Sequence, residues 1–227
     1  THMGRFDFVT GDELRAALGA RHGVEPDRVV VGCGGVEIGR LAAAAVLDPG
    51  HEVLFGDHSF QEYSILAHIN SATPIPVAMQ GESYDLAAIT ARIRPETALV
   101  IVCNPNNPTG TGVPTTEVEA LLDAVPPTFL ALVDEAYWEF TDGRLGESAI
   151  ALTERHSNLV VLRTFSKAFG LAGLRVGYGI CGSPQVASAM RKLQLPFSVN
   201  MLAQVAAMSA LQREPEGLAA ATRIAAA

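Results

Sequence analysis

Residues 161–178 read VLRTFSKAFGLAGLRVGY and hold Lys167, one of only two lysines among the 16 basic residues of the chain. An apolar strand pattern leads into a turn with hydroxyl and glycine residues, and a second strand pattern begins at Arg175. A lysine ammonium can lose its proton and attack a carbonyl, whereas an arginine guanidinium stays protonated. A lysine at this point of an arginine-rich chain therefore indicates covalent chemistry, the alternative being a surface lysine that supplies only charge.

On both sides of this segment, short β-rich runs alternate with helical patterns. Strands are predicted at residues 28–31, 52–55, 75–78, 98–103, 129–134, 158–163 and 175–181. Helices are predicted at residues 11–22, 36–47, 61–70, 86–93, 116–124, 185–193 and 201–212. This alternation predicts a three-layer α/β/α fold with a mostly parallel central sheet, and the lack of a linker or charge block predicts one domain over residues 1–227.

Composition excludes several classes of partner. The net charge of −8 and the isoelectric point near 5.2 argue against nucleic acid or an anionic membrane. No apolar run approaches the roughly 20 residues that span a bilayer, and the first residues lack the apolar core of a signal peptide. The three cysteines form no CxxC pair and the six histidines show no metal-ligand spacing. We therefore expect a cytoplasmic protein without a metal site.

The unusual residues of the chain follow the predicted strands. In an open α/β sheet, ligands bind beyond the carboxyl ends of the strands. The segments at these ends are Gly32-Cys33-Gly34-Gly35, Gly56-Asp57-His58-Ser59-Phe60, Asn104-Pro105-Asn106-Asn107-Pro108-Thr109-Gly110, Asp134-Glu135-Ala136-Tyr137 and Thr164-Phe165-Ser166-Lys167. A site is therefore predicted at one edge of the sheet.

Two of these segments suit a phosphate group. Thr164 and Ser166 supply hydroxyls and Arg175 a guanidinium, which together around one amine suit a phosphate monoester beside an aldehyde. The glycine turn at residues 32–35 precedes a predicted helix, whose free backbone N–H groups can bind an anion. The alternative for that turn is a tight strand-to-helix connection, and it is not a Walker A loop because no Gly-Lys-Ser/Thr occurs in the chain.

Two further segments suit a heterocyclic ring. The run FLALVDE at residues 129–135 resembles a Walker B strand, but without a Walker A partner Asp134 is better explained as the partner of a ring N–H⁺. Tyr137 can reach an adjacent phenolic oxygen, and Asn107 lies in a loop stiffened by proline. A lysine, a phosphate seat and these ring partners together describe a site for pyridoxal 5′-phosphate.

Three motifs carry a resemblance to a known family. The segments NNPTG (residues 106–110), DEAY (134–137) and RTFSKAFGLAGLRVGY (163–178) closely resemble those of fold-type I aminotransferases, most closely the histidinol-phosphate aminotransferase group. The similarity runs over almost the whole chain in the same order. It implies the large domain of the aspartate-aminotransferase-like fold, pyridoxal phosphate as cofactor and a homodimer.

The resemblance also implies roles for individual residues. Lys167 would form the Schiff base with the cofactor and then act as the base that moves the substrate Cα proton. Asp134 would keep the pyridine nitrogen protonated, and Asn107 and Tyr137 would hydrogen-bond the ring hydroxyl. Phe60 would stack on the ring. The phosphate would be held by Thr164, Ser166, Arg175 and the amides of Gly35 and Val36.

Several positions depart from the family pattern. The turn at residues 32–37 lacks the usual serine and acidic residue, and His58 replaces a proline. Phe6 replaces a tyrosine whose hydroxyl reaches the partner subunit's cofactor, and Gln194 stands where arginine is common. The N-terminal arm and the C-terminal small domain of these enzymes are expected to be absent from residues 1–227.

We therefore expect a pyridoxal-phosphate-dependent aminotransferase that exchanges an amino group between an amino acid or amino-phosphate substrate and a 2-oxo acid by a ping-pong mechanism. The departures favour an amino acid other than that of the histidine enzyme. One alternative keeps the cofactor but decarboxylates a phosphorylated amino acid. Another is a degenerate, non-catalytic domain of the same fold.

Overall fold

The computed structural model describes residues 11–213 and contains one seven-stranded sheet with the strand order β1-β7-β6-β5-β4-β2-β3. The strands are β1 (Val29–Gly32), β2 (Glu52–Gly56), β3 (Thr73–Val77), β4 (Thr97–Cys103), β5 (Leu130–Asp134), β6 (Leu159–Thr164) and β7 (Gly177–Cys181). The helices are α1 (Asp12–His22), α2 (Gly34–Ala44), α3 (Glu62–Ile69), α4 (Leu86–Arg92), α5 (Thr115–Ala124), α6 (Pro184–Leu193) and α7 (Met201–Gln212). All seven strands and all seven helices predicted from the sequence are confirmed, with shifts of at most three residues at their ends.

Two of these shifts concern the predicted site. Helix α2 begins at Gly34 rather than residue 36, and the Glu37 carboxylate accepts a hydrogen bond from the N–H of Cys33, the residue just before the helix. Strand β7 begins at Gly177 rather than residue 175, because a short 3₁₀ helix covers Ala172–Leu174 and Arg175 has a left-handed backbone with φ of 60°. Residues 5 and 6, which carry one of the departures from the family pattern, lie outside the described residues.

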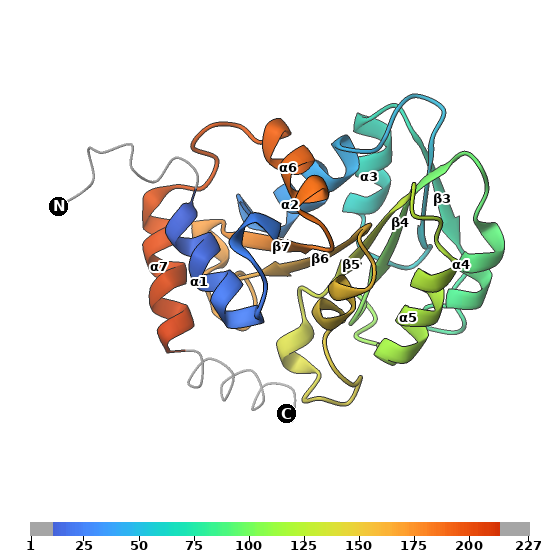
Figure 1. Cartoon of the computed structure of the whole chain (residues 1–227). Coiled ribbons are helices and arrows are strands. Elements are labelled where there is room, and N and C mark those ends of the chain that lie inside the picture. Colours follow the sequence, from blue (N-terminus) through green and yellow to red (C-terminus); the bar gives the residue numbers. More distant parts are fainter. Residues whose placement is uncertain (1–10, 214–227) are drawn as a thin grey trace.

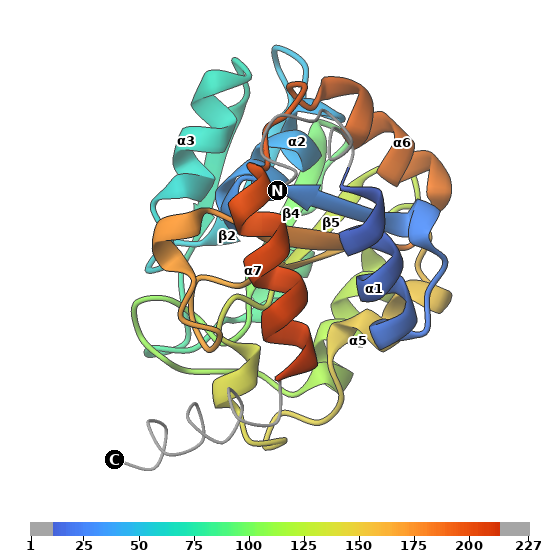
Figure 2. The ribbon, with the colours of Figure 1, turned by 90° about the vertical axis from the view of Figure 1, so that its left-hand side faces the viewer.

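The helices form two layers around the sheet (Figure 1). Helices α2, α3 and α6 cover one face, and α4 and α5 cover the other. Figure 2 shows α1 and α7 side by side at the β1 end of the sheet, where they contact each other. No helix within residues 11–213 is long and apolar enough to cross a membrane. The three-layer architecture is as predicted.

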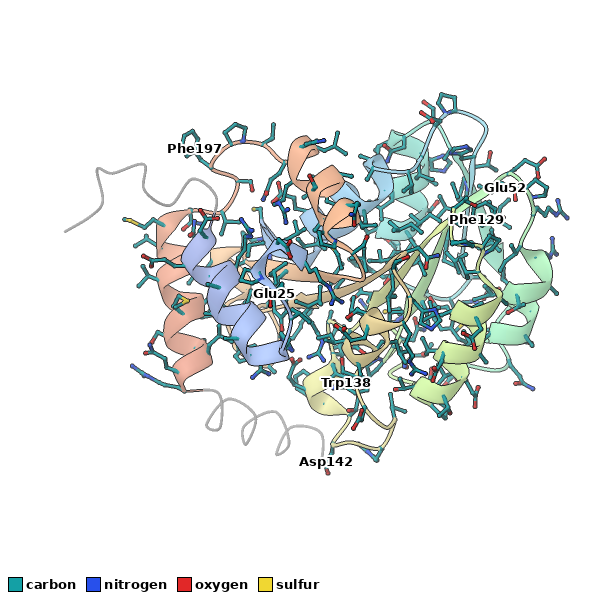
Figure 3. All side chains as sticks on the ribbon, in the orientation of Figure 1. Glu25, Glu52, Phe129, Trp138, Asp142 and Phe197 are labelled. Carbon is teal, nitrogen blue, oxygen red and sulfur yellow. The ribbon has the colours of Figure 1, made fainter. Side chains whose placement is uncertain are left out.

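Strand direction explains why the site residues gather. Strands β2, β4, β5 and β6 run parallel, whereas β7 runs antiparallel to both β6 and β1. Strand β7 therefore begins at the edge where the others end, and Gly177 pairs with both Gly32 and Thr164. Figure 3 shows Glu52 and Phe129 together at the opposite edge, by the amino ends of β2 and β5.

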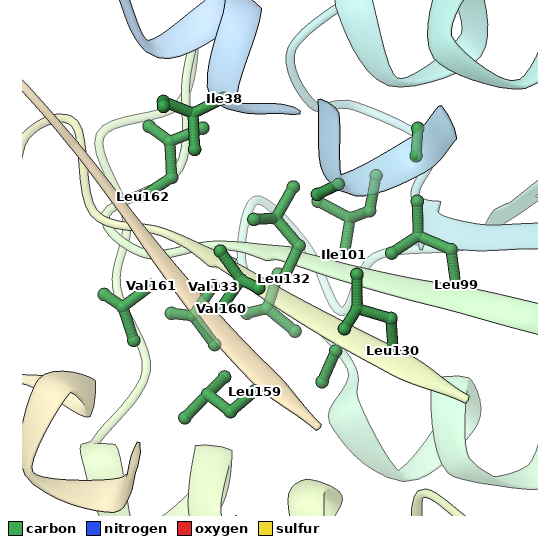
Figure 4. Close-up of a cluster of buried hydrophobic side chains, with 14 of the residues drawn as sticks. Ile38, Leu99, Ile101, Leu130, Leu132, Val133, Leu159, Val160, Val161 and Leu162 are labelled. Atoms are coloured by element: carbon green, nitrogen blue, oxygen red, sulfur yellow. The ribbon is translucent and has the colours of Figure 1, made fainter. Parts of the chain in front are cut away.

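The central strands form the core. Every residue of β4, β5 and β6 is buried, and Figure 4 shows their leucine, isoleucine and valine side chains on both faces of the sheet. Full burial of one such side chain contributes about 1.5–3 kcal/mol. Figure 4 also shows Ile38 of α2 close to Leu162 of β6. Helix α2 can approach so closely because β7 has Gly179 there, where a Cβ would lie 2.9 Å from Ile38 Cγ2. The start of α2 is thereby fixed over the sheet edge.

Candidate active site

A cavity of about 270 Å³ lies at this edge of the sheet, between α2, α3 and the ends of β5 and β6. Eight of the ten residues predicted for the cofactor site line it: Gly35, Val36, Phe60, Asp134, Thr164, Ser166, Lys167 and Arg175. These residues come from five separate segments of the chain. The predicted convergence at one edge is therefore present in the structure.

One end of the cavity is built to receive an anion. Gly34, Gly35 and Val36 form the first turn of α2, where backbone N–H groups have no partner within the helix. Gly34 has a φ of +77°, and a Cβ there would collide with the guanidinium of Arg175. A Cβ on Gly177 would lie 2.6 Å from the Gly35 nitrogen. Only glycines at these points let the arginine and strand β7 approach the helix start so closely.

Two hydroxyls connect this arginine to strand β6. The Thr164 hydroxyl donates to Ser166 Oγ at 3.0 Å and accepts the Ser166 N–H at 3.1 Å. Arg175 Nη1 donates to Ser166 Oγ at 3.4 Å and to the Ala172 carbonyl at 3.0 Å. The guanidinium is exposed to solvent and has no carboxylate within 4.0 Å among residues 11–213. Its charge is therefore available to a bound anion such as a phosphate.

The other end of the cavity holds a buried carboxylate. Asp134 ends strand β5 and is 6% exposed. Its Oδ1 accepts the Ala136 N–H at 3.0 Å, and its Oδ2 accepts the Tyr63 hydroxyl at 2.9 Å. Burial raises the pKa of Asp134 above its ordinary value of 3.8, although these two hydrogen bonds act against the rise. Within residues 11–213, no cationic side chain lies within 4.0 Å of this carboxylate.

The amine and its aromatic neighbour lie beside these two ends. Lys167 Nζ lies 4.8 Å from the centre of the Tyr137 ring, in cation–π contact. The Lys167 side chain is exposed in the described part of the chain. Tyr137 and Asn107 do not line the first cavity; both line a second one of about 480 Å³, with Arg144. Tyr137 thus lies between the lysine and the second cavity.

Hydrogen bonds fix the loop that carries Asn107 to the loop that carries Phe60. Asn106 is buried, and its Nδ2 donates to the His58 carbonyl at 2.8 Å while its Oδ1 accepts the Ser59 hydroxyl at 2.7 Å. Both Asn-Pro bonds of this segment are cis. Asn106 and Tyr63 were not predicted as part of the site. The NPNNP spacing was a signal for Asn106, whereas the contact of Tyr63 with Asp134 joins positions 71 residues apart and had no local signal.

This donor set fits pyridoxal phosphate. The anion seat, formed by the first turn of α2 with Thr164, Ser166 and Arg175, suits its phosphate. The buried Asp134, which has no cationic partner among residues 11–213, suits a protonated ring nitrogen, and Lys167 supplies the amine. Phe60 lines the same cavity and presents an aromatic ring. No group of three or more histidine, cysteine, aspartate or glutamate side chains in the described part of the chain could hold a metal ion.

Comparisons with known proteins point the same way. The family described as aminotransferase class I and II matches residues 4–226. An aromatic amino acid aminotransferase of Mycobacteroides abscessus is 44% identical over 207 residues, covering 91% of this chain and 59% of the relative. Histidinol-phosphate aminotransferase 2 of Ralstonia nicotianae is 44% identical over 209 residues, covering 92% of this chain and 56% of the relative. The chain thus spans less than two thirds of the length of these relatives.

Solved structures share the fold. The crystal structure of histidinol-phosphate aminotransferase from Sinorhizobium meliloti in complex with pyridoxal-5′-phosphate superposes with a TM-score of 0.90 at 28% identity, covering 97% of this chain and 59% of that one. L-threonine-O-3-phosphate decarboxylase from Porphyromonas gingivalis superposes with a TM-score of 0.77 at 25% identity, covering 92% of this chain and 63% of that one. The aspartate-aminotransferase-like fold predicted from the sequence is therefore confirmed.

Proposed function

The chain belongs to the class I and II aminotransferase family, and on that premise we propose that it is a pyridoxal-phosphate-dependent aminotransferase. It exchanges an amino group between an amino acid or amino-phosphate substrate and a 2-oxo acid by a ping-pong mechanism. The observation that carries this proposal is one cavity that combines Lys167, the anion seat at the start of α2, and a buried Asp134 that has no cationic partner within residues 11–213.

Binding follows from the two ends of the cavity. The phosphate would be held by the backbone N–H groups of Gly35 and Val36 in the first turn of α2. The hydroxyls of Thr164 and Ser166 and the guanidinium of Arg175 would complete its set of donors. Phe60 would cover one face of the ring, and Asn107 and Tyr137 would donate to the ring hydroxyl. The bound cofactor supplies an electron sink that weakens the substrate Cα–H bond.

Two residues handle the protons. Asp134 holds a proton on the ring nitrogen, and the low dielectric around this buried carboxylate strengthens the pairing. Lys167 would hold the cofactor through Nζ, and once substrate takes its place the same Nζ would accept the substrate Cα proton. The contact with the Tyr137 ring limits where Nζ can move. The two groups that hold or move protons, the Asp134 carboxylate and Lys167 Nζ, are therefore both positioned by the edge of the sheet.

The proposal is tested on the only two lysines of the chain. Purified protein loaded with the cofactor should absorb visible light, and borohydride should fix a pyridoxyl group on the peptide that contains Lys167. Lys167→Ala should lose both the visible band and turnover. Lys192→Ala is the matched control, because Lys192 lies on α6 outside both cavities and should change neither. A pyridoxyl group on Lys192, or an unchanged spectrum in Lys167→Ala, would refute the assignment.

A separate question is which amino donor the protein uses. The relatives named above act, by their names, on aromatic amino acids and on histidinol phosphate, and both are 44% identical to the chain. We propose that this protein uses a donor other than histidinol phosphate, with aromatic amino acids first in a panel, because residues 35, 36, 58 and 194 depart from the histidine enzyme pattern. Full turnover of imidazole-acetol phosphate with glutamate would contradict this. Carbon dioxide release without a 2-oxo acid would indicate the decarboxylase instead.

We further propose a cytoplasmic homodimer. The three cysteines are free, as expected in a reducing compartment. The family resemblance supports the dimer, and sedimentation should then give twice the chain mass of 23.9 kDa. A single species at the chain mass would contradict it.

A further inference from the structure

Tyr63 lies next to the Asp134 carboxylate in the first cavity. It belongs to the first turn of α3, is 2% exposed, and lines the same cavity as Asp134. Its hydroxyl donates to Asp134 Oδ2 at 2.9 Å. Because the other carboxylate oxygen accepts only the Ala136 N–H, Tyr63 is the one side chain of residues 11–213 that hydrogen-bonds this carboxylate.

The Tyr63 ring also contacts the aromatic residue proposed to cover the cofactor ring. Phe60 packs edge-on against it, with ring centres 5.8 Å apart and an interplanar angle of 88°. Phe55 of β2 packs on it at 6.0 Å and 63°. These two contacts fix the tyrosine ring, so the direction of its hydroxyl is set by packing. One side chain therefore connects the face and the nitrogen end of the ring site.

The hydroxyl keeps its proton at all working pH values. Burial, and the negative charge of Asp134, raise the pKa of Tyr63 well above its ordinary value of 10.0. Tyr63 is therefore a permanent donor to the carboxylate and not a proton carrier.

We propose that Tyr63 is the positioning residue that sets the basicity of Asp134, and thereby decides whether the proton between Asp134 and the cofactor stays on the ring nitrogen. This inference rests on the proposed function. A hydrogen bond to the charged form of an acid lowers its basicity. With the Tyr63 donor removed, Asp134 becomes a stronger base and draws that proton toward itself. The ring then withdraws electrons less strongly, and the nitrogen that links it to Lys167 becomes more basic.

The test is a pH titration of the visible band of the cofactor-loaded protein. In Tyr63→Phe, which keeps the packed ring, we expect the midpoint to rise by about one pH unit, because the lost hydrogen bond acts directly on Asp134 and reaches the titrating nitrogen only through the ring. We expect kcat to fall about tenfold with KM changed much less, because the group acts through the electron sink and not through substrate contacts.

The matched control is Tyr84→Phe. Tyr84 is also buried, at 5% exposure, and its hydroxyl donates at 2.9 Å to Ser59 Oγ rather than to Asp134. Loss of this hydroxyl should leave the midpoint in place. Equal midpoints in the unmodified protein and Tyr63→Phe, or equal shifts in both variants, would overturn the inference.

A second variant moves the midpoint the other way and does not rely on removing a group. Site-specific Tyr63→3-fluorotyrosine keeps the ring and strengthens the O–H donor, so the midpoint should fall below that of the unmodified protein. A rise or no change would overturn the inference. A visible band with an unmoved midpoint is distinct from the failure of the proposed function, in which the unmodified protein shows no band at all.

Discussion

Asp134 and Glu135 are consecutive buried carboxylates with opposite surroundings. Asp134 faces the cavity and receives two neutral donors, Tyr63 and the Ala136 N–H. Glu135 faces the other side of the sheet, where Arg163 donates to it at 2.8 Å and the Ser148 hydroxyl and Ala149 N–H each donate at 2.7 Å. Burial raises the pKa of both carboxyls. Within residues 11–213, only Glu135 has a cationic side chain as a partner.

This difference separates a carboxylate that stabilises the fold, Glu135, from one that is proposed to bind the cofactor, Asp134. The Glu135 side is complete in itself: Arg163 also donates to Glu139 at 2.7 Å and lies 5.6 Å from the centre of the Trp138 ring. A buried charge without a partner is costly, so a fold keeps one only where something else supplies the partner. In the proposed function, the cofactor supplies the missing partner on the Asp134 side. We expect substitutions on the two sides to affect different measurements.

The largest effect is expected at Asp134. Asp134→Asn should lower turnover roughly 10²- to 10³-fold, the usual effect of losing one preorganised electrostatic group. The fold should not suffer, because the amide oxygen can still accept the Ala136 N–H and the amide nitrogen can donate to the Tyr63 oxygen. Steady-state kinetics and denaturant unfolding of the cofactor-free protein measure the two quantities. A variant that is strongly destabilised without cofactor would contradict the contrast.

The second effect is expected on the other side of the strand. Glu135→Gln should lower the free energy of unfolding by about 3 kcal/mol, the lower part of the range for breaking a buried pair, because Glu139 still compensates Arg163. The visible-band midpoint of the loaded protein should not move. Urea unfolding and the pH titration check this, and a shifted midpoint with normal stability would show that the two carboxylates are not independent.

The sequence predicted the fold through residues whose pattern is local. The apolar runs of β4, β5 and β6 and the glycine turn before α2 are visible within a few residues, and their order alone brings Asp134 and Thr164 to one edge. Eight of the ten predicted site residues line one cavity for that reason. Tyr137 and Asn107 line another, because the direction of their side chains depends on loop geometry and not on strand order.

Long-range partners were beyond the sequence pattern. The bond between Tyr63 and Asp134 joins α3 to β5, and the bond between Arg163 and Glu139 joins β6 to the turn after β5. Neither has a spacing that a helix or a strand imposes. The exposure of Lys167 was also beyond the local pattern, because apolar neighbours in sequence do not determine solvent exposure at a turn. The alternation of strand and helix patterns predicts which segments lie together, but it does not predict which side chains form hydrogen bonds.

A smaller effect is expected from the neutral donor on the Glu135 side. The Ser148 hydroxyl donates to Glu135, accepts from Arg163 at 3.0 Å and caps the short helix Ala149–Glu154 by accepting the Ile150 N–H at 3.1 Å. Ser148→Ala should therefore lower the free energy of unfolding by about 1–2 kcal/mol. It is the structural counterpart of Tyr63→Phe and should leave the visible-band midpoint unchanged. A moved midpoint would mean that charge is shared across the sheet.

The smallest effect is expected in the pH dependence of the cofactor-free protein. Because the folded pKa of Asp134 lies above its ordinary 3.8, its protonated form favours the folded state. Its contribution to stability is fully present below pH 3.8 and is lost as pH rises through the folded pKa, with a slope of at most about 1.4 kcal/mol per pH unit.

The stability of the unmodified protein minus that of Asp134→Asn should show this fall. Glu135, whose pKa is also raised by burial, and His22, whose burial lowers its pKa to about 3, occur in both proteins and cancel in the difference. Bound cofactor with a protonated ring should remove the slope, because it supplies a cation that the described residues do not provide to Asp134. A slope that persists in the loaded protein would mean that Asp134 is not the ring partner.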